Sequence, residues 1–571
     1  MTRVSKLWVL PEPVAPEVEG ALAPFRPIER SILARRALWT AGAAQEFLDP
    51  QAGTGHDPFA LLGMETAVGR LLRACRRGES IVVYGDYDAD GLTAAALLVQ
   101  VLSDLGGRVE AQIPNRFEEG YGLQIEAIRQ LRAAGAGVVV TVDCGIRSLE
   151  EADEARALGL DLIITDHHHP GPMLPAALAV INPRQSGDGY PFKELSGAGL
   201  ALKVAQALCR RGGRPEPQQV IDLVALGTVA DLVPLAGENR SLVAAGLQQL
   251  NARPGSARPL RPGLQALLYV AGLQPGNIDA GAIAFALAPR LNAVGRLRSA
   301  EAAYHLLVTT DAREASRLAG ALQAANRERQ ELTRQVVEAA RERALGAEVI
   351  PELVFAAAPD FHPGVVGLAA ARLMEECYRP VVLAVRGADT SRGSARSIPE
   401  FHITQALDAC ADLLVRHGGH AAAAGFTLRT EDLDAFASRL QHVAAERLAG
   451  VEFRPKLDID AEVRFDELDD ELMRFLEAME PCGYGNPRPL LLAREVAVTE
   501  ARPVGRDNAH LKLSLAQGRR RMEGIAFRQG WRLPGMPRWL DMAFHLERND
   551  YVGVQTLQLN VVDIRPSGEA D

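Results

Sequence analysis

Three aspartates alternate directly after a short apolar run near residue 80. The segment reads Val-Val-Tyr-Gly-Asp-Tyr-Asp-Ala-Asp-Gly and places carboxylates at Asp86, Asp88 and Asp90. Two further β-branched runs end in a similar way, one at Asp143 and the other in an Asp-His-His triplet that begins at Asp166. Several such strand ends on one sheet would concentrate negative charge at one edge, which is tolerable only if cations are bound there. These residues therefore indicate a metal-dependent enzyme.

The mixture of aspartate and histidine suits Mn²⁺ or Mg²⁺, and imidazole shifts the balance towards Mn²⁺. Two such ions about 3.5–4 Å apart can hold a phosphate, activate water and stabilise the leaving oxygen. An EF-hand calcium loop would need a glutamate eleven residues after its first aspartate, where this chain has Leu97. Capping of the following helix accounts for one of the three carboxylates but not for all of them.

Alternating strands and helices must position these side chains. Such alternation predicts an α/β fold with a mainly parallel sheet, in which ligands collect at the carboxyl ends of the strands. The acidic and imidazole groups all fall at such ends. The predicted strands are 81–85, 108–113, 138–142, 161–165 and 178–181, separated by helices that include 91–105 and 123–134.

The rest of the chain is expected to form further domains, because 571 residues are too many for one core. A long charged helix should link the parallel-sheet domain to a smaller α/β domain. Five short strands near the end (490–500, 509–515, 521–527, 540–547 and 554–564) predict an OB-like β-barrel. The expected boundaries are 1–50 for an extension without an assigned task, 51–311 for the catalytic domain, 312–346 for the linking helix, 347–450 for the second domain and 451–571 for the barrel.

Composition is typical of a soluble globular protein, with 47% hydrophobic and 23% charged residues. The six cysteines are scattered without a C-x-x-C pair, which fits a reducing cytoplasm. No secretion signal or membrane-spanning run is expected, because no stretch approaches 18 apolar residues. A net charge of −10 argues weakly against nucleic acid, but DNA needs only a local basic track.

Several motifs, taken together and in order, resemble known phosphoesterases. Four motifs resemble those of the DHH phosphoesterase superfamily. They lie at 86–91, 142–145, 165–168 (Thr-Asp-His-His) and 227–235 (Gly-Thr-Val-Ala-Asp-Leu-Val-Pro-Leu). Those at 289–297, 362–367 and the Gly-Gly-His-Ala stretch from 418 resemble its RecJ family of bacterial single-strand-specific exonucleases. The resemblance runs from about residue 50 to 568 and implies a DHH domain, a DHHA1 domain and an OB-fold.

The resemblance also implies roles for the acidic and imidazole groups. Asp143 is the expected bridge between two metal ions, and His168 is expected to support the site or the scissile phosphate. Asp86 and Asp166 could be further ligands or could orient the others. The implied metal ligands are Asp88, Asp90, Asp143, His167 and Asp231.

Contacts to DNA are implied along the rest of the chain. The residues expected to contact the DNA strand are Arg116, Arg290, Asn292 and Arg296. Ser394, Arg396, His417, Gly418, Gly419 and His420 resemble a phosphate pocket for the 5′ end, although Gly/Ala strings also serve tight packing. In the barrel, Phe527, Trp531 and Tyr551 could stack on bases, unless the core takes up Phe527.

The function that the resemblance implies is a single-stranded-DNA-specific 5′-to-3′ exonuclease. It would release 5′-mononucleotides by two-metal-ion hydrolysis, in the cytoplasm, during DNA repair and recombination. Single-stranded-DNA-binding protein and repair helicases are the expected partners. Two alternatives remain: a short-oligonucleotide or cyclic-dinucleotide phosphodiesterase, against which the appended β-domain argues, and a non-catalytic replication scaffold, against which the full ligand set argues.

Overall fold

The structure is a computed structural model, and it describes residues 5–50, 55–115, 122–253, 255–256, 258–345, 350–551 and 554–568. The chain divides into two compact units. One comprises Val9–Ala321 and Asp458–Asp571, and the other comprises Met1–Trp8 and Leu322–Leu457. The boundary falls within a 33-residue helix, α15 (Ala312–Ala344), at the place where the sequence predicts a linking helix.

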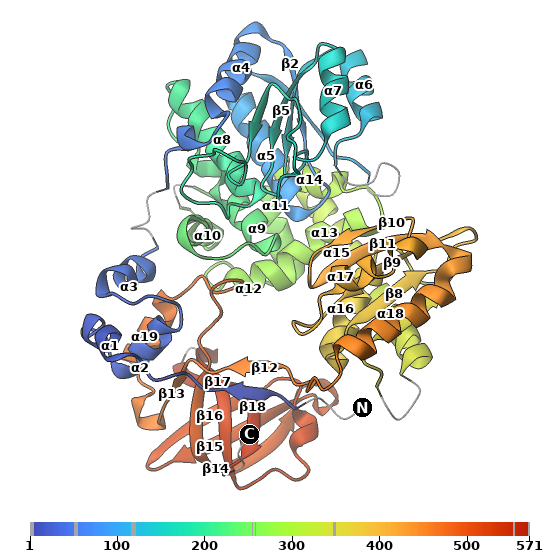
Figure 1. Cartoon of the computed structure of the whole chain (residues 1–571). Helices are drawn as coiled ribbons and strands as arrows, with labels where there is room; N and C mark the ends of the chain where they lie inside the picture. Colours follow the sequence, from blue (N-terminus) through green and yellow to red (C-terminus); the bar gives the residue numbers. More distant parts are fainter. Residues whose placement is uncertain are drawn as a thin grey trace. The chain divides into compact units, whose positions relative to one another are not determined.

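A five-stranded parallel sheet forms the centre of the first part of the larger unit, as predicted (Figure 1). Its strand order is β3-β2-β4-β5-β6. The strands are β2 (Ser80–Tyr84), β3 (Arg108–Gln112), β4 (Ala136–Val142), β5 (Asp161–Thr165) and β6 (Ala179–Ile181).

Helices cover both faces of this sheet because its β-branched strands are apolar on both sides. Apolar residues of α6 (Ile125–Ala133) and α7 (Leu149–Ala157) share one buried core with β2, β4 and β5. The helices α4 (Met64–Arg77), α5 (Ala89–Asp104) and α8 (Gly197–Arg211) lie on the other side (Figure 1).

A helical region follows the sheet and completes this domain. Its helix α9 ends at the residue before Asp231, and α13 carries the 289–297 motif. The helices are α9 (Ile221–Ala230), α10 (Gly237–Leu250), α11 (Pro262–Ala271), α12 (Ala280–Ala282), a π-helical turn Ile283–Leu287, α13 (Ala288–Leu297) and α14 (Glu301–Val308).

The C-terminal part of the same unit is a closed five-stranded barrel, because β14 pairs with both β15 and β17. Its strands form the ring β14-β15-β16-β18-β17, and α19 (Asp470–Ala478) precedes them. The strands are β14 (Leu491–Val504), β15 (His510–Gln517), β16 (Arg520–Ala526), β17 (Trp539–Tyr551) and β18 (Val554–Pro566), with a short β13 (Ala461–Glu462) beside β14.

The N-terminal extension packs against this barrel rather than standing alone. Leu22, Ile32 and Leu33 are fully buried in the same apolar cluster as Phe465 and Phe544. The extension contains β1 (Leu7–Val9), α1 (Pro16–Ala21), α2 (Pro27–Ala34) and α3 (Ala41–Leu48). A task for residues 18–48 that the sequence does not reveal is thus to complete the apolar core of the C-terminal domain.

The smaller unit contains a mixed five-stranded sheet with the order β10-β11-β9-β8-β7. The residues 390–396 and 423–429, which the sequence does not identify as strands, form its antiparallel centre. Small residues are needed there, because a Cβ at Gly393 would lie 2.2 Å from the ring of Phe426. The elements are β7 (Val354–Ala358), α16 (Val366–Cys377), β8 (Val381–Val385), β9 (Thr390–Arg396), α17 (Ile403–Asp408), β10 (Arg416–Gly419), β11 (Ala423–Arg429), α18 (Leu433–Arg447) and β12 (Lys456–Asp458).

Candidate active site and metal centre

The carboxyl ends of β2, β4 and β5 bring the predicted acidic and imidazole groups together. Three groups of side chains have ligand atoms that all lie within 4.8 Å of one another. Asp143 and His167 each belong to two of these groups, so the groups form one continuous site. They are Asp86 with Asp88 and Asp143, Asp143 with His167 and His168, and Asp90 with His167 and Asp231.

Asp90 is held by the amino end of a helix. Its carboxylate accepts hydrogen bonds from the backbone N–H groups of Gly197 (2.6 Å) and Ala198 (2.9 Å), at the start of α8. The helix dipole favours negative charge at this place. On the other side, a Cβ at Gly227 would lie 2.4 Å from Asp90 Oδ1, so only glycine allows α9 to pack here.

The loop that carries Asp86 and Asp88 is fixed at two points. Asp88 Oδ1 accepts from the N–H groups of Asp90 (3.0 Å) and Gly91 (3.1 Å) and thereby caps α5. Asn292 of α13 accepts a 2.7 Å hydrogen bond from the N–H of Ala89. Helix capping thus uses one oxygen of Asp88, as expected, and it does not account for the carboxylates of Asp86 and Asp90.

Asp143 lies at the centre of the cluster. Its backbone is left-handed (φ 62°), and a Cβ at Gly197 would come within 2.7 Å of its side chain. Asp143 Oδ1 lies 3.0 Å from His167 Nε2. Both atoms are buried, and neither has a hydrogen-bond partner among the residues that the structure describes. Buried polar atoms without partners are costly, and two that converge in this way match the donor set of a bound cation.

Asp166 orients His168. Its Oδ1 lies 2.7 Å from His168 Nδ1, and its Oδ2 accepts from the N–H of Ile146. Although burial opposes the charge on His168, the hydrogen bond and charge of Asp166 raise its pKa to about 9. Asp166 itself belongs to none of the three groups of possible ligands. The structure therefore favours the orienting task for Asp166, one of the two roles that its position in the sequence allows.

The carboxylates raise one another's pKa values. Burial, and then repulsion from Asp88, raises the pKa of Asp90 to about 7. Burial and then Asp90 raise the pKa of Asp231 to about 8, and the same causes raise that of Asp143 well above its usual range. Divalent cations would remove this repulsion. The residues therefore fit a centre for Mn²⁺ or Mg²⁺.

We predict that the metal-free protein loses stability as the pH rises from about 6.5 to 8.5. In this interval folded Asp90 (pKa about 7) and Asp231 (about 8) release protons, whereas the unfolded carboxyls are already ionised. The folded state then binds more protons than the unfolded state, so each such proton costs about 1.4 kcal/mol per pH unit. His168, with its pKa of about 9, acts in the same direction.

Thermal melting in EDTA and in Mn²⁺ across this interval measures the effect. The melting temperature should fall with pH in EDTA and stay nearly level in Mn²⁺. Parallel curves in the two buffers would contradict the prediction. Lower pH values are left out of the measurement because burial depresses the pKa of His167 to about 3, so this one group works against the trend below about pH 6.5.

The predicted DNA contacts in the larger unit are scattered over several elements. Arg290 and Arg296 lie on α13, where Arg290 donates to the carbonyl of Ala286. Asn292 is engaged with Ala89, as described above. Arg116 and the side chain of Tyr551 lie outside the described residues. DNA contacts for all of these residues stay a prediction.

In the smaller unit, Ser394 and Arg396 lie close to the first turn of α16. A Cβ at Gly367 would lie 3.0 Å from Arg396 Nη2 and 3.4 Å from Ser394 Oγ. Burial lowers the pKa of Arg396. Within the described parts of the chain Arg396 has no carboxylate partner at ion-pair distance. The guanidinium, the hydroxyl and the helix start thus share one small space that suits an anion.

The other proposed phosphate ligands lie along the edge strand of the same sheet. Gly418 and Gly419 are exposed in β10, and His420 follows them. His417 Nε2 lies 2.8 Å from Asp408 Oδ1, so this ring is engaged by a carboxylate.

Aromatic side chains are exposed on the barrel. Phe527 is 52% exposed, so the core does not take it up, and its ring lies 5.3 Å from that of His510. Trp531 and Trp539 are also about half exposed. Trp539 is a stacking candidate that the sequence analysis misses.

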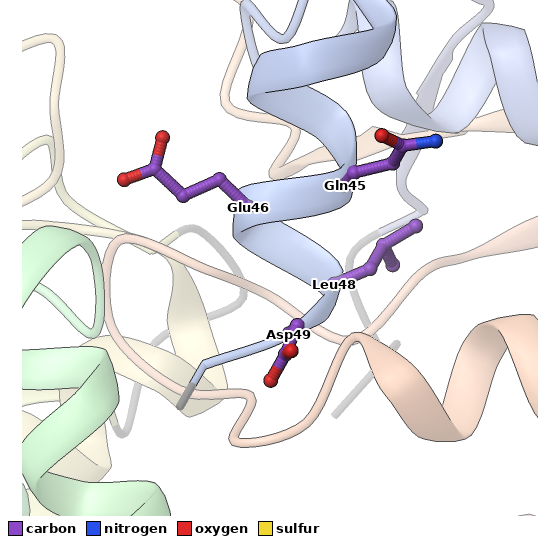
Figure 2. A pocket seen from close by; sticks show the side chains of 4 residues that line it. All are labelled: Gln45, Glu46, Leu48 and Asp49. Carbon is purple, nitrogen blue, oxygen red and sulfur yellow. The ribbon is translucent and has the colours of Figure 1, made fainter. Parts of the chain in front are cut away.

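One surface pocket lies on α3, away from the elements that carry the acidic cluster. It is lined by Gln45, Glu46, Leu48 and Asp49 (Figure 2). Its two carboxylates do not suit a nucleic-acid phosphate.

Three family models match successive parts of the chain. Residues 80–228 match the DHH family N-terminal domain, 351–446 match the DHHA1 domain, and 459–563 match the RecJ OB domain. The single-stranded-DNA-specific exonuclease RecJ of Salmonella typhimurium is 36% identical over 530 residues, which are 89% of this chain and 91% of that protein. The chain belongs to the RecJ family.

Other members of the RecJ family extend the match. The Thermus thermophilus RecJ is 38% identical over 93% of this chain and 74% of its own length. The Bacillus subtilis RecJ is 37% identical over 88% of this chain, but the match spans only 63% of that longer protein. The crystal structure of the Thermus RecJ with Mn²⁺ has a TM-score of 0.84 and 33% identity, and it covers 99% of this chain and 80% of that one. The expected family and fold are confirmed.

Two glycines that pack against the acidic cluster are not predicted as site residues from the sequence. Gly197 and Gly227 touch Asp143 and Asp90, yet neither glycine carries chemistry of its own. A signal for the first is the small-residue string Ser-Gly-Ala-Gly at 196–199, which starts a helix where a phosphate or carboxylate can approach closely.

None of the helices in the described parts of this RecJ family chain has both the length and the apolarity needed to cross a bilayer.

Proposed function

We propose that this chain is a single-stranded-DNA-specific exonuclease that hydrolyses phosphodiester bonds from the 5′ end and releases 5′-mononucleotides. The observation that carries the proposal is that two buried atoms without hydrogen-bond partners, Asp143 Oδ1 and His167 Nε2, lie 3.0 Å apart. Asp86 and Asp88 adjoin Asp143, and Asp90 and Asp231 adjoin His167. Relatives of this chain are named single-stranded-DNA-specific exonucleases, which supports the substrate and the class of reaction.

Each residue of the site has a task in this reaction. Bound Mn²⁺ or Mg²⁺ supplies the positive charge that polarises a phosphate and makes water a nucleophile at neutral pH. Asp143 belongs to two of the three ligand groups, so its carboxylate could contact two metal ions. The start of α8 holds the carboxylate of Asp90 in place. Asp166 raises the pKa of His168 to about 9, so a protonated His168 would place positive charge beside the scissile phosphate.

Specificity for single strands is assigned to the β-barrel. An OB-fold binds single strands through a charged groove and through aromatic rings that stack on bases in any sequence. The half-exposed Phe527, Trp531 and Trp539 offer such rings. A phosphodiesterase for short substrates has no use for this track, so substrate length separates the two functions.

The reaction is tested with 5′- and 3′-labelled oligonucleotides in single- and double-stranded form. We expect the 5′ label of the single strand to appear first, as a mononucleotide, and the 3′-labelled strand to shorten stepwise. Equal rates on duplex DNA, or release of the 3′ label first, would contradict the proposal. Faster hydrolysis of dinucleotides than of long strands would favour the short-substrate enzyme.

We also propose that Ser394 and Arg396 bind the 5′-phosphate, together with the first turn of α16. Arg396→Ala should weaken apparent affinity for 5′-phosphorylated strands about tenfold to a hundredfold, because a charge-assisted hydrogen bond contributes roughly 1.5–3 kcal/mol. Substrates with a 5′-hydroxyl should be nearly unaffected. The measurement is KM for the parent and the variant on both substrates. Equal losses on both would assign Arg396 to the fold or to the general DNA path.

The proposed setting is DNA repair and recombination in the cytoplasm, with single-stranded-DNA-binding protein and repair helicases as partners that supply unwound strands. The compartment is supported by six cysteines that are all unpaired. Pull-down of the partners from a lysate, with and without nuclease treatment, separates protein contacts from bridging through DNA.

A further inference from the structure

A turn of the C-terminal domain lies against the loop that follows the metal-ligand candidate Asp231. The N–H of Leu235 donates a 2.8 Å hydrogen bond to the carbonyl of Tyr484. Gly485 is left-handed (φ 74°), and a Cβ there would lie 2.8 Å from Pro234 Cβ. A Cβ at Gly483 would similarly lie 2.8 Å from Leu235 Cδ1. The two glycines therefore allow a fit that no larger residue would allow.

Arg240 of α10 anchors this turn in the larger unit. It is only 2% exposed, and all five of its N–H groups donate to backbone carbonyls. Four of these carbonyls follow each other at the end of α19, where a helix leaves its last carbonyls without partners. The guanidinium also stacks on Phe47 at 4.0 Å. The acceptors are Phe47 (3.0 Å), Ala478 (2.9 Å), Met479 (2.8 Å), Glu480 (2.9 Å) and Pro481 (3.2 Å).

Two asparagines add hydrogen bonds to this contact, one within the turn and one to the loop. Asn486 donates to the carbonyls of Met479 (3.0 Å) and Pro481 (2.9 Å), which holds the turn closed. Asn239, next to Arg240, donates 3.1 Å to the carbonyl of Pro234. The loop after Asp231 is thus held between its own domain and the turn of the C-terminal domain.

Asp231 depends on this support more than Asp88 and Asp90 do. Backbone N–H groups hold the carboxylates of Asp88 and Asp90 directly. In contrast, no group in the described parts of the chain donates a hydrogen bond to the carboxylate of Asp231, which lies 3.4 Å from His167 Nε2. The next residue, Leu232, is left-handed (φ 57°), a strained conformation that persists only where the surroundings impose it.

We propose that the turn at residues 481–486 is a positioning element of the metal centre, which sets the carboxylate of Asp231 by fixing the loop 232–235. The C-terminal domain then serves both DNA binding and the integrity of the Asp90–His167–Asp231 ligand group. This inference rests on the proposed metal-dependent function.

The test uses Gly485→Ala in the full chain, with Gly518→Ala as its matched control. Gly518 is also left-handed (φ 58°) and lies in the same barrel, but nothing lies within 4 Å of its Cβ position. Mn²⁺ binding is titrated by calorimetry and by electron paramagnetic resonance, beside thermal melting and DNA binding in EDTA. Gly485→Ala should lose about tenfold to a hundredfold in affinity at one Mn²⁺ site, the loss typical of supports behind metal ligands. Gly518→Ala should bind Mn²⁺ as the parent does.

Arg240→Lys is the second variant and keeps the inference testable if Gly485→Ala fails to fold. Lysine retains the charge but cannot serve five carbonyls, so the same loss of Mn²⁺ affinity is expected, with unchanged DNA binding in EDTA. Parent-like Mn²⁺ titrations of the folded variants would overturn the positioning role. A parent protein that binds no Mn²⁺ would instead overturn the proposed function itself.

Discussion

Asp143→Asn should abolish nuclease activity and at the same time stabilise the metal-free protein. The carboxylate is shared by two ligand groups, and a neutral amide cannot neutralise the charge of two cations. Loss of roughly 4 kcal/mol of transition-state stabilisation corresponds to about a thousandfold in rate. The gain in stability follows because the substitution removes one of several buried carboxylates that repel each other.

Asp222→Asn is the control for this prediction. Asp222 is equally buried in the same domain, but it pairs with Arg261 at 2.8 and 2.9 Å. Its substitution should lower the melting temperature and leave Mn²⁺ binding intact. Turnover and melting in EDTA are measured for both variants. Substantial turnover by Asp143→Asn at saturating Mn²⁺, or destabilisation equal to that of Asp222→Asn, would refute the assignment.

Gly197→Ala should reduce turnover about a hundredfold or more without unfolding the protein. The new methyl group would lie 2.7–2.9 Å from the side chain of Asp143, so the carboxylate or the start of α8 must move. The N–H of residue 197 also holds Asp90, so both acids would be displaced. A misplacement of about 1 Å in a catalytic site can cost a hundredfold in rate.

Gly199→Ala provides the comparison two positions further along α8. Its methyl group would meet the flexible end of Leu195 at 3.3 Å, with Ser196 Oγ at 3.5 Å and Leu195 Cβ at 3.7 Å, which are ordinary or nearly ordinary contacts. We expect near-parent kcat for this variant and similar melting temperatures for both. Equal kcat values for the two variants would show that the close packing at Gly197 has no catalytic consequence.

The sequence predicts the parallel sheet and its acidic edge well, because β-branched runs and strand-end aspartates are local signals. Asp88, Asp90, Asp143, His167 and Asp231 do converge. The sequence does not show that Asp166 holds His168, because a triplet of adjacent residues carries no information on which side chain faces which neighbour.

Other features depend on contacts between distant segments and leave no local trace. The strands at 390–396 and 423–429 are rich in Gly, Ser and Ala, which have low β-propensity, and they form because Phe426 packs over Gly393. The burial of Leu22 and Ile32 in the core of a barrel more than 400 residues later is equally invisible in either segment alone. The same holds for the bonds from Arg240 to the end of α19.

Anomalous diffraction at the manganese edge, from crystals of the full chain grown with Mn²⁺, tests the central claim most directly. The account predicts two peaks at the carboxyl edge of the parallel sheet. One should lie among Asp86, Asp88 and Asp143, and the other among Asp90, His167 and Asp231, with Asp143 between them. A single peak, or peaks away from these side chains, would contradict a two-metal centre built from them.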